Sequence, residues 1–172
     1  MGSWAVPPKE QRNQRGLAGD SSVGLDTVDL QLLELVQTEG RITLSELGRR
    51  VRMSPAAVGE RIRRLEANGT ITGYTAVVAP ERLGYGIQAF VRVSPHAGIT
   101  LCHFRSQDLI NRPEILEVHH VIGEDCWILK IAVRNTAHLE ELLEKISSVG
   151  RTTTSIVLSS PVERRILRPA AG

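Results

Sequence analysis

Residues 54–65, SPAAVGERIRRL, have the features of a short helix with a defined start. Ser54 is a favourable N-cap because its hydroxyl can accept a hydrogen bond from a free amide of the first turn. Pro55 falls at the first helical position, where no backbone donor is needed. Apolar residues recur with helical spacing and predict one buried face, made of Val58, Ile62 and Leu65.

The opposite face of this helix has two interpretations. It carries small residues first and charged residues later: Ala56, Glu60, Arg63, Arg64 and Ala67. Small side chains allow close approach to a DNA major groove, where arginines reach base edges or phosphates. The alternative is a solvated basic face, since a basic patch alone is a weak signal.

The preceding residues favour the DNA-binding interpretation. Asp26 is placed to cap a helix, and Asp29 adds a second negative charge to its first turn. Gly40 ends that helix, and residues 43–46, TLSE, have the pattern of a capping box that opens the next one. Residues 51–53 then form a tight turn into Ser54. Two short helices, a turn and a third helix with an arginine face predict a helix-turn-helix.

Charge is unevenly distributed although the net charge of the 172 residues is only +2. Residues 49–64 contain six arginines and a single acid, Glu60. The first helix is acidic instead, with Asp26, Asp29, Glu34 and Glu39. We therefore expect a positive end at the turn and third helix, which suits a nucleic-acid partner.

The second half of the chain has another rhythm. Residues 86–93, 115–122, 127–133 and 152–158 are expected strands, and helices are expected over residues 99–111 and from Asn135 onward. The turn over residues 123–125 makes the middle two strands a hairpin. The resulting order, βαββαβ, is the ferredoxin-like pattern, so the fold class is α+β with an N-terminal helix-turn-helix domain.

A ferredoxin-like sheet has both helices on one face, which leaves the other face open. Apolar residues fall there too: Phe90, Val121, Ile128 and Val157. An uncovered apolar patch is costly, and the same face of a second copy is the simplest cover. A homodimer would also supply two recognition helices for a palindromic operator in double-stranded DNA.

Three stretches together resemble one family. They are residues 25–33 (LDTVDLQLL), residues 40–74, which include the arginine helix, and residues 121–130 (VIGEDCWILK) on the hairpin. They are similar to the Lrp/AsnC regulators, the leucine-responsive and asparagine-responsive or feast/famine proteins, over residues 25–159. The resemblance implies dimers that assemble further, often into octamers, with an amino-acid-like effector bound at the hairpin turn.

The resemblance carries DNA-facing roles to the exposed positions of the third helix. The candidate DNA-binding residues are Ser54, Ala56, Ala57, Glu60, Arg61, Arg63 and Arg64. Arg61 lies nearer the buried edge of the helix, so pairing with Asp29 or another acid of the first helix is an equal alternative for it.

The candidate effector-binding residues lie at the hairpin turn and on the last strand: Ile122, Gly123, Glu124, Asp125, Cys126, Trp127, Thr152, Thr153 and Thr154. The turn can offer backbone amides to a carboxylate and acids to an ammonium group, and threonines on an adjacent strand could add hydroxyls. An ordinary hairpin turn is the alternative, because Gly and Asp are common in turns. The sequence departs from the family at Cys126, where many members have Asp, and at Trp127, which replaces a Tyr; the effector class stays open.

The remaining segments define the domain limits. We expect a disordered tail over residues 1–24, the helix-turn-helix over 25–70, a linker strand or wing over 71–85, the effector and oligomerisation domain over 86–159, and a tail over 160–172. Two cysteines without metal or disulfide spacing fit a reduced, cytoplasmic protein. No apolar run is long enough for a membrane span.

The sequence thus predicts a DNA-binding transcriptional regulator that responds to a small amino-acid-like effector and has no cofactor, metal or catalytic residues. The alternative is an enzyme, because some siroheme decarboxylases resemble the same two-domain architecture and use histidines against a tetrapyrrole.

Overall fold

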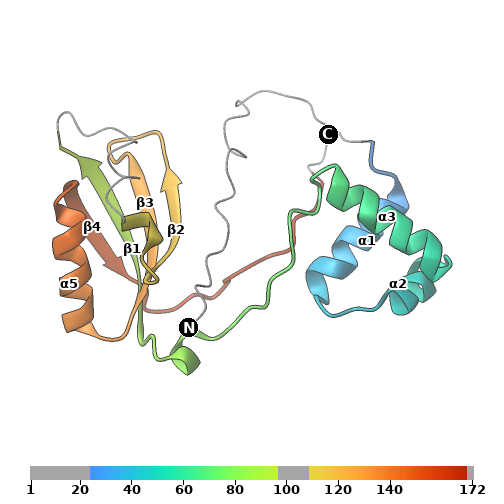
Figure 1. Cartoon of the computed structure of the whole chain (residues 1–172), viewed down its shortest axis with the longest axis horizontal. Helices are drawn as coiled ribbons and strands as arrows, with labels where there is room; N and C mark the ends of the chain where they lie inside the picture. The colour runs from blue at the N-terminus through green and yellow to red at the C-terminus, as the bar shows by residue number, and fades with distance from the viewer. Residues whose placement is uncertain (1–23, 97–108, 170–172) are drawn as a thin grey trace. The chain divides into compact units, whose positions relative to one another are not determined.

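The computed structural model describes residues 24–96 and 109–169. The chain forms two compact units (Figure 1): unit 1 is Met1–Tyr74 together with Ile166–Gly172, and unit 2 is Thr75–Arg165. Within the described residues, no helix is both long and apolar enough to cross a membrane.

Unit 1 contains three helices, α1 (Thr27–Thr38), α2 (Leu44–Val51) and α3 (Pro55–Ala67). One small apolar cluster holds them together, with at least one buried residue from each helix: Leu32, Leu47, Val58, Ile62 and Leu65. The three α3 residues are those that the helical spacing predicts. The expected helix-turn-helix is therefore confirmed.

The helix starts are set by local side-chain caps. Asp26 and Asp29 form a reciprocal capping box, since each carboxylate accepts from the other residue's amide. Ser54 Oγ accepts from the Ala57 amide at 3.2 Å, with Pro55 at the first helical position. The box expected at α2 is only half formed: Thr43 Oγ1 accepts from the Glu46 amide, but the Glu46 carboxylate binds arginines instead.

The turn between α2 and α3 depends on a close backbone approach at Gly48. A Cβ atom there would lie 2.5 Å from the Met53 carbonyl oxygen, which is impossible without displacing the backbone. Arg52 in the left-handed region (φ 57°) caps α2, and the Met53 amide donates to the Gly48 carbonyl at 2.9 Å. Gly48 thus lets the chain reverse tightly enough to place α3 against α2.

The prediction of a linker strand or wing after α3 is wrong. Residues 72–79 have no regular secondary structure, and Pro80–Leu83 form a short 3-10 helix, η1. Val77 and Val78 are exposed, and no described strand pairs with them. High β propensity cannot form a strand without a partner backbone.

Unit 2 contains one antiparallel sheet in the order β2-β3-β1-β4. The strands are β1 (Ile87–Pro95), β2 (Ile115–His120), β3 (Trp127–Val133) and β4 (Gly150–Ile156), and α5 (Thr136–Ser147) precedes the last of them. This strand order is that of the ferredoxin-like pattern, which the chain order predicts. Of the helix expected over residues 99–111, the part over 97–108 lies outside the described residues, and its end is the 3-10 turn η2 (Leu109–Asn111).

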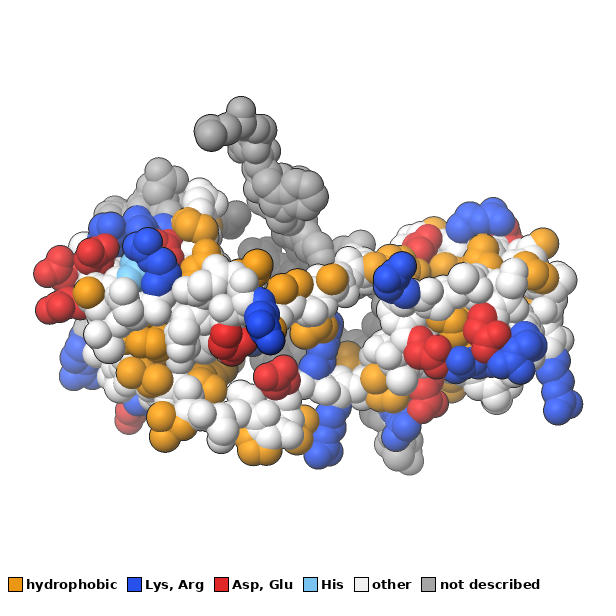
Figure 2. Space-filling model, turned by 90° about the horizontal axis from the view of Figure 1, so that it is seen from below, with side chains coloured by type: hydrophobic (Ala, Val, Ile, Leu, Met, Phe, Trp, Pro, Cys, Tyr) orange, Lys and Arg blue, Asp and Glu red, His pale blue; other side chains and the backbone are white. Residues whose placement is uncertain are grey.

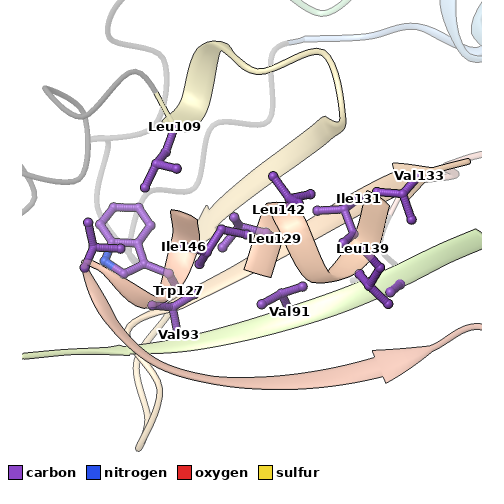
Figure 3. Packing of buried hydrophobic residues seen from close by; sticks show 12 residues of the cluster. Val91, Val93, Leu109, Trp127, Leu129, Ile131, Val133, Leu139, Leu142 and Ile146 are labelled. Atoms are coloured by element: carbon purple, nitrogen blue, oxygen red, sulfur yellow. The ribbon is translucent and has the colours of Figure 1, made fainter. Parts of the chain in front are cut away.

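The core of unit 2 lies between α5 and one face of the sheet (Figure 3). Strand residues at every second position point to it, and Leu139, Leu142 and Ile146 of α5 pack against them. Trp127 and Leu109 close one end of this core, where Trp127 also stacks on His120 with ring centroids 4.6 Å apart. The alternation of β1 fixes which residues face outward, including Phe90 and Arg92.

A buried polar contact that the sequence pattern does not reveal joins the start of β2 to α5. The Glu114 carboxylate, 6% exposed, accepts from Arg112 and lies 2.9 Å from His138 Nε2. Burial by itself raises the pKa of Glu114, but its hydrogen bonds outweigh burial and leave the pKa below its usual value. The charge of Glu114 is therefore stabilised by its partners.

Candidate DNA interface and effector turn

The solvent-facing side of α3 matches the face that the helical wheel predicts. Ser54, Ala56, Glu60, Arg63 and Arg64 are exposed, whereas Ala57 and Arg61 are half-buried. Arg52, in the turn before α3, is exposed as well. The candidate DNA-binding residues therefore divide into an open group and two residues at the edge of the core.

Two arginines of α3 are bound to a buried carboxylate on α1. Asp29 is 1% exposed and accepts from Arg61 Nη1 at 2.8 Å and from Arg64 Nη2 at 2.8 Å. Arg61 also donates to Asp26, and these hydrogen bonds raise the pKa of Arg61. The pKa of Asp26 is lowered, first by the Asp29 amide and then by Arg61. Arg61 thus makes the pairing with acids of the first helix that the sequence offered as one alternative, and its contact with DNA stays a prediction.

Arg63 is the most exposed of the three α3 arginines. Its side chain is 69% exposed, and its partner is Glu60, an exposed residue one turn earlier at 2.7 Å. A pair of this kind is worth little and exchanges readily with other partners. Arg63 can therefore reach a ligand outside the protein without breaking a buried contact.

The arginines of α2 also pair with acids of the same unit. Glu46 binds Arg49 and Arg50, and their hydrogen bonds lower the pKa of Glu46 to about 2. Arg50 binds Glu39 as well. The expected positive end is thus less positive than the arginine count suggests, because acids from α1 and α2 fold back onto it, as the neighbouring red and blue side chains of this unit illustrate (Figure 2).

The hairpin turn joins β2 to β3 with its tip in solvent. The Val121 amide donates to the Cys126 carbonyl at 2.9 Å, and the residues between them form the tip. Ile122 is 94% exposed, and Gly123 has φ 154° with open space around its α-carbon. Glu124 is exposed and Cys126 is half-buried. This tip offers backbone and one free carboxylate to a ligand.

Asp125 of the same turn is held by β1. Its Oδ1 accepts from Ser94 Oγ at 2.7 Å, and its Oδ2 lies 3.4 Å from Arg92 Nη1. Sequence reasoning missed Ser94 and Arg92. Strand alternation could place Arg92 on the outer face, but the contact depends on the β1–β3 register, in which Arg92 pairs with Ile128 and Val93 with Trp127.

The prediction that the threonines of β4 lie on a strand adjacent to the hairpin is wrong. β1 lies between β4 and β3 in the sheet. Thr153 pairs with Arg92 of β1, while Thr152 and Thr154 pair with core-facing residues and are half-buried. Thr153 therefore shares the outer face and the sheet end with Arg92. Trp127, 7% exposed, belongs to the core rather than to the turn surface.

In the described residues, no group of three or more His, Cys, Asp or Glu side chains could hold a metal ion. His119 lies 3.0 Å from Glu117, whereas the next residue, His120, stacks on Trp127. The two histidines thus serve opposite faces of the strand, as their alternation predicts.

Comparison with known proteins gives matches over both units. Residues 25–66 match the AsnC-type helix-turn-helix domain, and residues 88–167 match the Lrp/AsnC ligand binding domain. A Bacillus subtilis relative, the uncharacterized HTH-type transcriptional regulator YezC, is 33% identical over 136 residues, which are 79% of this chain and 95% of the relative.

Solved structures agree. The structure of Bacillus subtilis LrpC is similar with a TM-score of 0.76 at 29% identity, over 81% of this chain and 99% of LrpC. A feast or famine regulatory protein from Mycobacterium tuberculosis complexed with L-methionine has a TM-score of 0.75 at 33% identity, over 84% of this chain and 99% of that one. This chain therefore belongs to the Lrp/AsnC family of transcriptional regulators.

Proposed function

We propose that this protein is a transcriptional regulator that binds operator DNA through α3 and changes its DNA affinity when an amino-acid effector binds at the hairpin turn. The observation that carries the DNA-binding half is the exposed Arg63 on a capped α3, beside the open Ser54 and Ala56. Both the open residues and the cap fit a helix whose N-terminal half enters a major groove.

The arginines of α3 have different roles in this proposal. Arg63 contacts a base edge or phosphate, since its side chain is open. Arg64, 56% exposed and bound to Asp29 through one amino group, reaches phosphate with the rest of its guanidinium. Arg61 is a positioning residue, because both of its partners are acids of α1. Ala57 and Glu60 complete the interface.

Alanine variants separate these roles. Arg63→Ala should weaken binding by about 1–3 kcal/mol if Arg63 contacts a base, or uniformly with a smaller salt slope if it contacts phosphate. Arg61→Ala should lower the stability of unit 1 as well. Arg82→Ala, an exposed arginine of η1, is the control and should bind as the parent does. Unchanged affinity and salt slope in Arg63→Ala would refute the DNA-binding role of α3.

The effector half rests on the tip of the hairpin. A free carboxylate at Glu124 suits an α-ammonium group, and backbone amides near Gly123 suit a carboxylate. Asp125 also contacts Ser94 and Arg92, so a ligand that binds Asp125 would be coupled to β1. L-Methionine is the first candidate, because a related regulator has been solved with it.

Operator affinity should be measured against the twenty amino acids, methionine first. A tenfold change requires about 1.4 kcal/mol of coupling, which one or two charge-assisted hydrogen bonds can supply. Gly123→Thr and Asp125→Ala should blunt the response and leave effector-free DNA binding near the parent value. Glu141→Gln, at an exposed position of α5, is the control. If no amino acid or close relative shifts the affinity of the parent, the sensing proposal fails.

We also propose a homodimer through the outer face of the sheet, which assembles further, up to an octamer, on a palindromic operator. Phe90 is 42% exposed at the centre of that face, between Lys130 of β3 and Ser155 of β4. Ile128, Val121 and Val157 are half-buried without a partner chain. Phe90→Glu would bury a carboxylate at the contact and should shift sedimentation toward monomer. Leu83→Glu, on η1, is the control, and a folded parent monomer at micromolar concentration would contradict the dimer.

The enzyme alternative is not favoured, since the relatives are transcriptional regulators. The proposed regulator acts in the cytoplasm without a cofactor. A Soret band after incubation with siroheme would revive the decarboxylase alternative.

A further inference from the structure

The C-terminal segment contacts the first helix of the DNA-binding unit. Gln37 of α1 bonds both polar groups of the Leu167 backbone: its Oε1 accepts from the amide at 2.8 Å, and its Nε2 donates to the carbonyl at 3.0 Å. Arg168 Nη2 donates to the Glu34 carboxylate at 2.7 Å. The structure accordingly assigns Ile166–Gly172 to unit 1.

This pattern of contacts recognises an extended backbone. A side-chain amide that donates and accepts on one residue replaces the pair of bonds that a neighbouring strand would make. Gln37 Nε2 also donates to the Leu33 carbonyl, which holds the amide in place. The Glu34–Arg168 pair one turn away selects the register of the segment, because Leu167 itself is 83% exposed and contributes little packing.

The contact changes how the two units are connected. The chain passes from unit 1 to unit 2 after Tyr74 and returns to unit 1 at Ile166. Unit 2 is therefore covalently connected to unit 1 at both of its ends. The docked segment binds α1, whose Asp29 holds Arg61 and Arg64 of α3. A displacement of residues 166–168 is therefore transmitted to α1, the helix that positions Arg61 and Arg64 of α3.

We propose that α1 is a docking site for the chain's own residues 166–168. This reversible contact is a second connection, besides the linker after Tyr74, through which effector binding at unit 2 changes the DNA affinity of unit 1. The coupling role rests on the function proposed above. Reversibility follows from the contacts, which are two hydrogen bonds at the surface and an ion pair with side chains 70% and 49% exposed. Such contacts are individually weak, but tethering keeps the segment at a high effective concentration.

Docking is tested by hydrogen exchange of the Leu167 amide in the full chain, measured by mass spectrometry with residue-level fragmentation. Gln37→Ala removes the acceptor, and we expect exchange to become about fivefold faster or more. Gln31→Ala, an exposed glutamine on the same helix, is the matched control and should leave exchange unchanged. Equal exchange rates in the parent and in Gln37→Ala would overturn the docking.

A charge swap tests the register. Glu34→Arg should release the segment as Gln37→Ala does, and Glu34→Arg with Arg168→Glu should restore slow exchange. Arg164→Glu in place of Arg168→Glu is the control, because Arg164 is exposed and lies before the docked residues. Failure of the double swap to restore slow exchange would contradict the assigned pair.

Coupling is tested with a chain that ends at Arg165, in the operator assay with the effector that shifts the parent. Loss of the segment should reduce a tenfold effector response to threefold or less, while circular dichroism stays that of a folded protein. A full response in the shortened chain would overturn the coupling role and leave docking intact. If the parent responds to no amino acid, the proposed sensing function and the coupling role fail together, whereas the exchange result still decides the docking.

Discussion

The two units place their functional residues differently with respect to their cores. In unit 1 the core is small, and two arginines on the candidate DNA-facing helix belong to a polar network around buried Asp29. In unit 2 the core is larger and apolar, and the tip of the candidate effector turn lies outside it in solvent. Substitutions near the DNA-binding face are therefore expected to lower stability as well as DNA affinity. Substitutions at the tip of the effector turn can change the effector response without a loss of stability.

The largest expected effect comes from truncating the core of unit 2. Leu142, 1% exposed, packs between α5 and the sheet, and Leu142→Ala should lower the free energy of unfolding of this unit by about 2–5 kcal/mol. Trp127 fluorescence, in a Trp4→Phe background, reports urea unfolding of unit 2. Leu158→Ala, at a residue 94% exposed, is the control and should leave the midpoint near that of the parent.

The next effect tests the polar network of unit 1. Asp29→Ala removes half of the capping box and the shared partner of Arg61 and Arg64, which should destabilise unit 1 by about 2–3 kcal/mol. Thermal unfolding followed by far-ultraviolet circular dichroism measures it, with Glu60→Gln as an exposed control. If Asp29→Ala were as stable as the parent, the network would be dispensable and the contrast between the units would disappear.

A pair of glycine variants sharpens the same contrast at the α2–α3 turn. Gly48→Ala places a methyl group 2.5 Å from the Met53 carbonyl oxygen, and we expect a loss of about 1–3 kcal/mol. Gly59→Ala meets only Leu44 Cδ1 at 3.4 Å and should be neutral or slightly stabilising, because alanine favours helix by up to about 1 kcal/mol. Urea unfolding of both variants gives the comparison; equal stabilities would show that the turn tolerates a side chain at Gly48.

The smallest effect is the acid response of unit 1. The folded pKa of Glu46 is lowered from 4.5 to about 2 by its hydrogen bonds with Arg49 and Arg50. A lowered pKa stabilises the fold above the unfolded value, and this contribution is lost as pH falls through the folded value. Stability should therefore fall between about pH 4.5 and pH 2, and less steeply in Glu46→Gln than in the parent. Glu140→Gln on α5 is the control for urea unfolding across this range.

The sequence predicted the helix starts, the strands of the sheet and the exposed face of α3. The predictions failed where a structure depends on a pairing partner elsewhere in the chain. Residues 71–78 have strand-forming side chains but pair with no described strand, and Glu46 prefers two arginines on its own helix to the Thr43 amide. The ends of the strands also shifted by a few residues, because backbone pairing rather than residue type ends a strand.

The candidate sites were predicted by position but not by contact. The exposure of Arg63 follows from the helical period. The hydrogen bond between Asp125 and Ser94, in contrast, depends on how far β1 extends beside β3. Docking of residues 166–168 on α1 could not be predicted, since so short a segment has no periodic signal and its contacts are with the distant residues Gln37 and Glu34.

By itself, the sequence determined the features that depend on near neighbours: the caps at Asp26 and Ser54, the apolar stripes and the hairpin. Each involves residues a few positions apart, so residue type and spacing are enough. Only the tertiary structure decided which arginines Asp29 binds 32 and 35 positions away, and which strand lies between β4 and the hairpin. Those choices depend on how whole elements pack, because many acids could pair with many arginines until the fold brings particular ones together.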